Sequence, residues 1–260
     1  MKGEIMGIFD VAQITLYVFL IFFVGLVFYL QRETRREGYP LFSEPSNKLK
    51  PGDPFFIPEA KVFKLPHGGE ARAPDDARID TRPGNAEKMA VWPGAPIEPI
   101  GDPMLAEVGP GSYAMRADVP DLMVNGGVKI VPFRVAPAFD ININDRDPRG
   151  FALVGANGVA VGTIKDVWID KSEIIIRYLE AELNAAGGKP GRSVLVPINF
   201  LRIDRDRGVV KVKALMGSQF GNVPGLKNPD QITFLEEEKV TAYYGAGTLY
   251  SDPQRAEPLL

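Results

Sequence analysis

Residues 11–30, VAQITLYVFLIFFVGLVFYL, form an apolar run of twenty residues without a formal charge. A helix of this length is about 30 Å long, which matches the hydrocarbon core of a bilayer. All faces of such a helix are apolar, whereas a buried helix of a soluble protein carries an apolar stripe beside polar residues. The run therefore predicts a single transmembrane helix with a short N-terminal tail and one large extramembrane part.

A cleaved signal peptide is the alternative interpretation of this run. A signal peptide has a basic start, an apolar core of about 7–15 residues and small residues at its cleavage site. Here the start is mixed, with Lys2, Glu4 and Asp10, the core is longer, and Phe28–Gln31 contains no small residue. These features favour a retained membrane span.

The charges beside the run predict its orientation. Only Lys2 precedes it, whereas Arg32, Arg35 and Arg36 follow it closely. An excess of basic residues marks the cytoplasmic side of a span. We therefore expect residues 1–10 to be periplasmic and residues 31–260 cytoplasmic. The arginines are expected to contact lipid phosphates. The alternative is that they only set the orientation of the span.

Composition excludes several classes of function. The chain has no cysteine and one histidine, His67, in a Pro-His-Gly-Gly loop. This excludes disulfides, thiol catalysis, cysteine-ligated metal centres and a serine–histidine–aspartate triad, and it predicts no metal site. The net charge of −3 argues against nucleic acid as a partner.

Proline divides the remainder of the chain. Of the 23 prolines, 17 lie between Pro40 and Pro148. Because proline breaks helices and central strands, residues 31–149 are expected to be extended, with short edge strands such as Lys61–Leu65. A disordered linker is the alternative, but aromatic residues such as Trp92 and Phe133 favour a segment laid across this protein's own domain or a partner.

From Gly150 the pattern changes to period two, and residues 150–250 are expected to form a small antiparallel β-barrel or sandwich. Turns are expected at Asp170–Glu173 and Asp204–Gly208. Asp230 is expected to cap a helix from Ile232 to Tyr244 that ends at Gly245 and Gly247, followed by a frayed tail, residues 251–260. The four expected strands are Val161–Ile169, Ile174–Leu183, Ser193–Ile203 and Val209–Leu215.

The candidate chemistry lies at the first of these turns, where Asp166, Asp170, Glu173 and Arg177 gather in the sequence. Asp170 and Glu173 bracket the turn, and neighbouring carboxylates that share a site titrate as a pair, which suits proton relay. Glu173 and Arg177 are expected on one face of the second strand, about 13 Å apart. A solvated charged turn is the alternative, and spacing alone favours it.

Taken in order, several short motifs resemble the H subunit of the purple-bacterial photosynthetic reaction centre. The resemblance extends from the apolar run to Tyr250, and the succession of motifs is more specific than any one of them. The motifs are Arg36-Glu-Gly-Tyr-Pro-Leu41, Gly101-Asp-Pro-Met104 with Gly109-Pro110, Lys129-Ile-Val-Pro132, Asp147-Pro-Arg-Gly150, Asp166-Val-Trp-Ile-Asp170 with Glu173, Arg177-Tyr-Leu-Glu180, and Glu236-Glu-Glu-Lys239 before Ala242-Tyr-Tyr.

The resemblance implies a PRC barrel in the cytoplasmic domain and a non-enzymatic role. Such a subunit caps the cytoplasmic face of the L and M subunits, stabilises the complex and supports proton transfer to the secondary quinone. It binds no electron carrier itself; the complex carries bacteriochlorophyll, bacteriopheophytin, quinones, non-haem iron and carotenoid. The further partners implied are a cytochrome subunit, a light-harvesting ring and membrane phospholipids, in the intracytoplasmic (chromatophore) part of the bacterial inner membrane.

The resemblance also implies roles for individual residues. Glu173 is the expected relay carboxylate, Asp170 its coupled neighbour and Arg177 an electrostatic tuner. Lipid headgroups are expected at Arg32, Arg35, Arg36 and Tyr39. The expected contacts to other subunits are Tyr29, Glu37, Tyr39, Pro40, Lys129, Glu236 and Glu237.

One departure from the family changes the expected proton route. Well-studied members of the family carry an aspartate and two histidines just before the Lys-Ile-x-Pro motif, where Met123, Asn125 and Gly127 stand here. None of these titrates near neutral pH. Protons are therefore expected to enter through Asp121 or Asp118, or through the L or M subunit, and inhibition by zinc or cadmium at this place is expected to be weak.

Two other classes of function remain open from the residues. A membrane-anchored scaffold or assembly protein would share only the PRC barrel with the H subunit. This hypothesis assigns no purpose to the Arg36–Leu41 and Gly101–Pro110 motifs. An anchored enzyme is disfavoured because the chain lacks nucleophile–base pairs and metal ligands. Copurification with pigmented polypeptides distinguishes these readings.

Overall fold

The computed structural model describes residues 10–43, 46, 48–49, 57–75, 80–185 and 191–255. The predictions for the periplasmic tail and for the last five residues of the chain therefore lie outside the described residues, apart from Asp10. The chain divides into two compact units, Met1–Ile79 and Asp80–Leu260. Each unit is described by itself.

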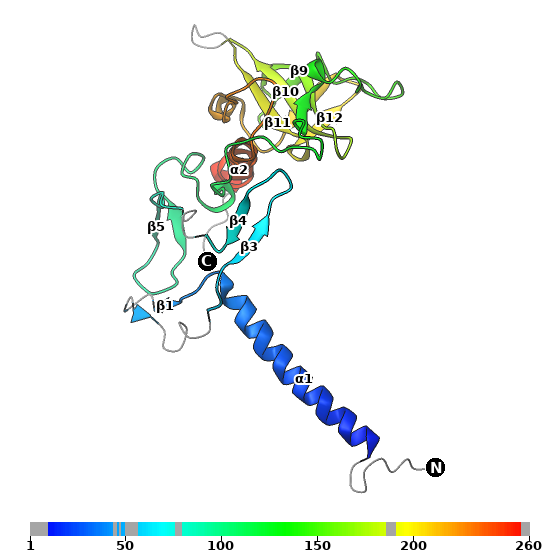
Figure 1. The fold of residues 1–260 in the computed structure, drawn as a ribbon. Coiled ribbons are helices and arrows are strands. Elements are labelled where there is room, and N and C mark those ends of the chain that lie inside the picture. The colour runs from blue at the N-terminus through cyan, green and yellow to red at the C-terminus, as the bar shows by residue number, and fades with distance from the viewer. Residues whose placement is uncertain are drawn as a thin grey trace. The chain divides into compact units, whose positions relative to one another are not determined.

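The first unit begins with α1 (Val11–Glu33), the long helix at the N-terminal end of the ribbon in Figure 1. With the 3₁₀ turn η1 (Thr34–Arg36) it forms a helical stretch of 26 residues that contains an 18-residue window with a mean hydropathy of 2.5, none of it buried. By length and composition this helix can cross a membrane, as predicted, and its apolar faces need lipid or partner helices around them. The short strands that follow pair as two hairpins: β1 (Phe42–Ser43) with β2 (Lys48–Leu49), and β3 (Lys61–Lys64) with β4 (Glu70–Ala73).

The second unit is mainly β, with a seven-stranded sheet ordered β11-β10-β9-β8-β13-β12 and β7 paired to β9. A separate hairpin, β5–β6, precedes it, and the sheet is open, with β11 and β12 at its edges. The strands are β5 (Ala86–Lys88), β6 (Ile97–Pro99), β7 (Ile130–Pro132), β8 (Ala152–Val154), β9 (Ala160–Asp170), β10 (Ile175–Leu183), β11 (Ser193–Pro197), β12 (Leu201–Asp204) and β13 (Val209–Val212). The helical elements are η4 (Gly109–Gly111), η5 (Phe133–Val135), η6 (Ile198–Phe200), η7 (Gly217–Asn222), α2 (Phe234–Tyr250) and η8 (Pro253–Arg255).

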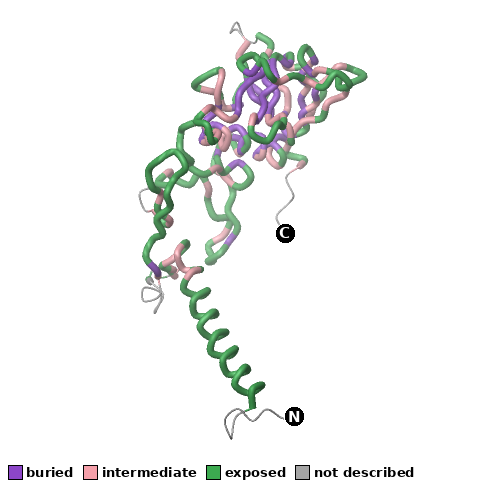
Figure 2. The backbone as a smooth tube through the Cα atoms, turned by 45° about the vertical axis from the view of Figure 1, so that its right-hand side comes forward, coloured by how far each residue is buried: buried purple, intermediate pink, exposed green. Residues whose placement is uncertain are grey.

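The core lies between the sheet and α2, where the buried segments of Figure 2 gather. Trp168 and Leu179 from the long strands are fully buried, as is Tyr244 from α2. The C-terminal half of β9 is buried on both faces. Part of the proline-rich stretch also helps to cover β9, because β7 pairs with this strand and Phe133 of η5 belongs to the same core.

Most strand expectations are confirmed, with three corrections. The expected strand Ser193–Ile203 is two strands, because Pro197 lacks the N–H that would continue the ladder and η6 follows it. The sheet is not purely antiparallel, since β13 runs parallel to β8. A register shift between Ile176 and Tyr178 leaves Arg177 as the extra residue of a bulge.

The C-terminal helix differs most from expectation. Its N-cap is Thr233 rather than Asp230, and it continues through Gly245 and Gly247 to Tyr250. A Cβ atom on Gly247 would lie 2.3 Å from the carbonyl oxygen of Ala214, and one on Gly245 would lie 2.5 Å from that of Pro110. These glycines therefore allow α2 to pack closely and do not end the helix.

Substituting alanine for Gly247 is expected to destabilise the second unit by about 1–3 kcal/mol, because the added methyl group would overlap Ala214. This loss exceeds the gain of about 1 kcal/mol that alanine brings to a helix interior. Denaturant unfolding measures the difference. Gly221→Ala is the matched control because a Cβ atom there meets nothing within 4 Å. Equal stabilities of the two variants would contradict the packing argument.

Candidate functional site

The side chain of Lys129 brings together three of the carboxylates that the sequence analysis selected. Its Nζ lies 3.3 Å from Asp121, 3.4 Å from Asp170 and 3.7 Å from Glu173. Lys129 directly precedes β7, whose Ile130 pairs with Asp170 at the end of β9. Strand pairing thus positions the ammonium beside the first turn, and we call these four residues the Lys129 cluster.

The members of the Lys129 cluster differ greatly in exposure. The side chain of Asp170 is 1% exposed, that of Asp121 is 32% exposed and that of Glu173 is 54% exposed. The cluster therefore connects a buried carboxylate to two that reach the surface. Such an arrangement is what proton movement between the surface and a covered site needs.

The turn between β9 and β10 holds Glu173 in place. The Oδ1 atom of Asp170 accepts hydrogen bonds from the backbone N–H groups of Ser172, at 2.9 Å, and Glu173, at 3.1 Å. The N–H of Ile174 donates to the carbonyl of Asp170, and Ile174 has a φ of +56°, which is unusual for a β-branched residue. Asp170 thus fixes the turn as well as carrying charge.

A short loop holds Asp121 beside Lys129. The Lys129 N–H donates to the carbonyl oxygen of Asp121, and the Met123 N–H donates to that of Gly127. The loop therefore forms a closed hairpin-like turn around Met123, Asn125 and Gly127. Asp121 lies at its base, within the cluster.

The charge of Lys129 is stabilised by its neighbours. Partial burial disfavours the ammonium, but the hydrogen bond to Asp121 and the charge of Asp170 outweigh that effect and raise the pKa of Lys129. The lysine therefore stays protonated at neutral pH. A permanent positive charge among three carboxylates reduces the repulsion between them at close range.

Glu173 and Arg177 do not share a strand face as expected. Glu173 belongs to the turn, since β10 begins at Ile175, and the bulge at Arg177 breaks the period-two alternation between them. The charge of Arg177 acts instead on Glu237 of α2, whose carboxylate accepts a hydrogen bond of 2.9 Å from Tyr178 Oη. Burial raises the pKa of Glu237, although Tyr178 and Arg177 oppose the shift.

Two other candidate carboxylates have roles within the fold. Glu236 is buried, and its side chain accepts from the N–H groups of Thr233 and Lys227, which completes the capping box of α2. Asp118 accepts from Thr233 Oγ1 and pairs with Lys227; these hydrogen bonds lower its pKa. Of the two uptake candidates, Asp121 rather than Asp118 lies in the Lys129 cluster.

In the first unit, the residues after α1 are arranged as follows. Arg36 donates two hydrogen bonds to Glu33, at 2.8 and 2.9 Å, and one to the carbonyl oxygen of Glu59, so its guanidinium is engaged within the chain. The guanidinium of Arg35 lies 5.5 Å from the ring centroid of Tyr39. The other predicted lipid or subunit contacts here, Arg32, Tyr29, Glu37 and Pro40, are exposed.

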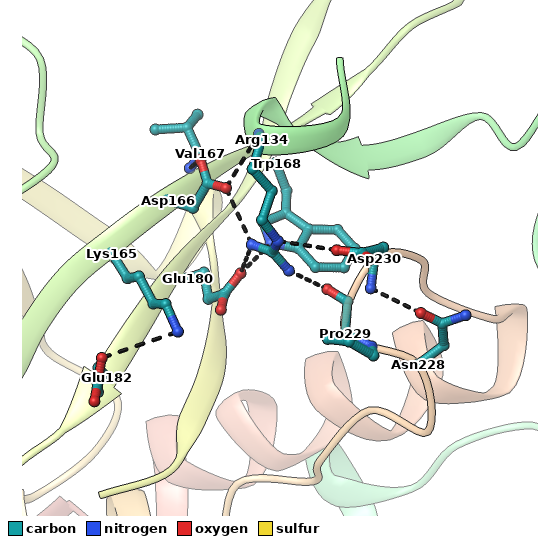
Figure 3. Close-up of polar contacts among 10 residues, drawn as sticks. All are labelled: Arg134, Lys165, Asp166, Val167, Trp168, Glu180, Glu182, Asn228, Pro229 and Asp230. Carbon is teal, nitrogen blue, oxygen red and sulfur yellow. Dashed lines mark hydrogen bonds and ion pairs between the residues drawn. The ribbon is translucent and has the colours of Figure 1, made fainter. Parts of the chain in front are cut away.

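A second charged network, centred on Arg134, was not selected from the sequence. Figure 3 shows the guanidinium between three carboxylates: Nη1 donates to Asp166 at 3.0 Å and to Glu180 at 2.6 Å, and Nε donates to Asp230 at 2.9 Å. Trp168 Nε1 also donates to Glu180, at 3.0 Å. Asp166 and Glu180 are buried and directly opposite in the β9–β10 ladder.

No local signal marks Arg134, because its partners lie 32, 46 and 96 residues away. Its network joins η5, the two long strands and the segment before α2. Asp230, expected as a helix cap, instead accepts a hydrogen bond from Arg134 in this network. The network supports the fold and shares no residue with the Lys129 cluster.

Two family models match this chain. A family model described as the photosynthetic reaction centre H-chain N-terminal region matches residues 3–135, and a PRC-barrel domain model matches residues 140–216. The first match covers half of the chain and includes α1, Asp121 and Lys129; the second includes the β9–β10 turn with Asp170 and Glu173. This chain therefore belongs to the H-chain family of the photosynthetic reaction centre and carries a PRC-barrel domain.

Proposed function

We propose that this H chain caps the cytoplasmic face of the L and M subunits, stabilises their complex and carries protons toward the secondary quinone through the Lys129 cluster. A reaction-centre H chain is a membrane-associated, non-enzymatic subunit, and its family implies L and M as partners. The observation that carries the proton-transfer proposal is the convergence of Asp121, Asp170 and Glu173 on one ammonium.

In this proposal Asp121 accepts protons from water, and Glu173 passes them to the partner subunits that cover it in the complex. Asp121 is the partly exposed carboxylate at the base of the loop, and Glu173 is held by the turn with its side chain extending outward. Asp170 and Lys129 hold the two within one electrostatic unit, so a proton gained by one carboxylate changes the affinity of the others. Arg177 tunes the neighbouring Glu237.

The first unit supports the anchoring part of the proposal. An apolar helix with no buried residue suits a span that packs beside helices of other subunits, and no Asp, Glu, Lys, Arg or His interrupts its apolar core. We propose that its N-terminus is periplasmic and that Arg32, Arg35 and Tyr39 lie at the lipid headgroups. The pigments, quinones and iron belong to the partner subunits in this proposal, with a cytochrome subunit and light-harvesting ring in the same chromatophore complex.

Mild solubilisation of the membrane tests the proposal as a whole. We expect the chain to copurify with bacteriochlorophyll-containing polypeptides. Purification of the chain alone and colourless from a pigmented membrane would contradict the proposal and favour a scaffold that shares only the PRC barrel.

Added zinc or cadmium is expected to inhibit the second reduction of the quinone only weakly. The positions that carry imidazoles in the family are Asn125 and Gly127 in this loop, and neither supplies a nitrogen ligand suited to zinc. The rate is measured with and without metal in the purified complex. Strong inhibition that is lost on deleting the side chain of Asn125 or Met123 would contradict the assignment.

Glu237→Gln is expected to raise the stability of the chain slightly at neutral pH. Burial raises the pKa of Glu237 above its unfolded value, so ionisation above the folded pKa costs stability, and this cost disappears as the pH falls below the unfolded value. Glutamine removes the cost and can still accept the hydrogen bond of Tyr178. Thermal unfolding across pH measures the effect; a variant that is less stable at neutral pH than at acid pH, relative to wild type, would contradict it.

A further inference from the structure

The outer face of β12 and β13 carries a row of cations. Arg202 lies directly opposite Lys211 in this antiparallel pair, and Lys213 directly follows the end of β13. The alternate residues Val210 and Val212 are fully buried in the core. Strand alternation therefore places Arg202 and Lys211 together on the solvent side of the sheet. Lys213 lines the same surface hollows as these two residues.

This arrangement costs stability in the isolated chain. Like charges directly opposite on neighbouring strands repel each other. Lys211 has a carboxylate partner, Asp204, at 3.6 Å, but neither Arg202 nor Lys213 forms an ion pair within the described part of the chain. An anion held over the row would relieve the repulsion.

The cations line two adjoining hollows that share Arg202, Lys211 and Lys213. The hollows have volumes of about 710 and 510 Å³. Arg205 lines the larger one and Arg255 the smaller, so the lining holds five cations and two carboxylates, Asp204 and Asp206. A third carboxylate, Asp145, pairs with Arg205 at 2.9 Å. We call this surface the basic groove; it is locally positive in a chain whose net charge is −3.

We propose that the basic groove binds an extended acidic segment of a partner polypeptide. Successive side chains on one face of an extended peptide are about 7 Å apart, so alternate carboxylates can meet cations on neighbouring strands. Phe200, Leu201 and Ala214 line the smaller hollow and give the peptide an apolar contact between its charges. The groove thus combines charge complementarity with a place for a small apolar side chain.

Other anions fit the basic groove less well. Five cations spread over two hollows exceed the reach of one phosphate, and the lining offers no apolar channel long enough for an acyl chain. A nucleic acid would extend beyond the groove onto a chain of negative net charge. The residues of the groove are distinct from the Lys129 cluster, so this proposal does not depend on the proton-transfer role.

Fluorescence anisotropy with the full-length chain in its purified complex tests the proposal. The probe is a labelled peptide of about eight residues, alternating glutamate and valine, which spans about 25 Å when extended. We expect Arg202→Glu with Lys211→Glu to weaken binding at least about tenfold, since two attractive charge pairs become repulsive. We also expect binding to weaken with salt and to be lost when glutamine replaces glutamate in the peptide.

The matched control is Lys64→Glu with Arg72→Glu, which makes the same charge change at exposed residues of β3 and β4. Equal binding by the two double variants, or no binding by wild type, would overturn the proposal. So would binding of inorganic phosphate or of phosphatidylglycerol vesicles at the groove in place of the peptide. Arg202→Gln separates binding from folding: it should weaken binding without lowering the unfolding temperature, and unchanged binding would also overturn the proposal.

Discussion

Replacing Arg134 with methionine is expected to lower the free energy of unfolding of the second unit by about 3–5 kcal/mol. The substitution keeps most of the side-chain volume but removes the charge that Asp166 and Glu180 share. These two carboxylates are buried and lie directly opposite each other in the β9–β10 ladder. Without the guanidinium, two desolvated like charges face each other, and Asp230 loses its hydrogen bond as well.

The cause can be separated from a simple loss of packing. Adding Asp166→Asn and Glu180→Gln to the Arg134→Met chain removes the uncompensated charges, so it should recover most of the lost stability. A deficit that this double substitution does not reduce would contradict the electrostatic explanation.

Arg149→Met is the matched control for the Arg134 variant. Arg149 also pairs with two carboxylates, Asp140 and Asp147, but all three side chains are more than one-third exposed. Surface pairs of this kind contribute less than about 1 kcal/mol. Denaturant unfolding should therefore distinguish the two variants clearly, and similar losses would show that burial of the Arg134 network has little energetic effect.

Glu173→Gln is expected to slow proton-coupled reduction of the secondary quinone by at least about tenfold while leaving assembly intact. A positioned carboxyl group that transfers protons commonly contributes 10²- to 10⁴-fold to a rate. Glutamine keeps the shape of the side chain but carries no exchangeable acid proton. Flash-induced kinetics of the second electron transfer, measured across pH, provide the readout, and pigment content reports assembly.

Glu182→Gln is the control for this experiment. Glu182 lies at the other end of β10, is exposed to a similar extent at 59%, and pairs only distantly with Lys165, at 3.9 Å. It changes the net charge of the chain by the same amount. Equal rates for the Glu173 variant and wild type would indicate that Glu173 is a solvated charge on the turn and does not transfer protons.

The patterns that could be predicted from the sequence are local. The apolar run 11–30 needs no partner to be identified, because length and hydropathy depend on adjacent residues alone. The same holds for the Asp170–Glu173 and Asp204–Gly208 turns, and Gly208 has the positive φ, +62°, that its turn requires. The alternation of β9 and β10 also follows from adjacent residues.

The misassigned elements depend on distant atoms. Gly245 and Gly247 resemble helix terminators in the sequence, but the carbonyl groups of Pro110 and Ala214 pack against them and explain why they are glycines. The parallel pairing of β13 with β8 and the bulge at Arg177 have no local signature either. Only the packed structure supplies these constraints.

The sequence by itself determined the long apolar N-terminal helix, the mainly-β second unit and the presence of Asp170 and Glu173 on a tight turn. The tertiary structure decided which groups share a site: it brought Lys129 and Asp121 to that turn and seated Arg134 between Asp166 and Glu180. The physical reason is the range of the interactions involved. Helix and turn formation depend on neighbours along the chain, whereas charge compensation depends on distances in space, which only strand pairing and packing fix.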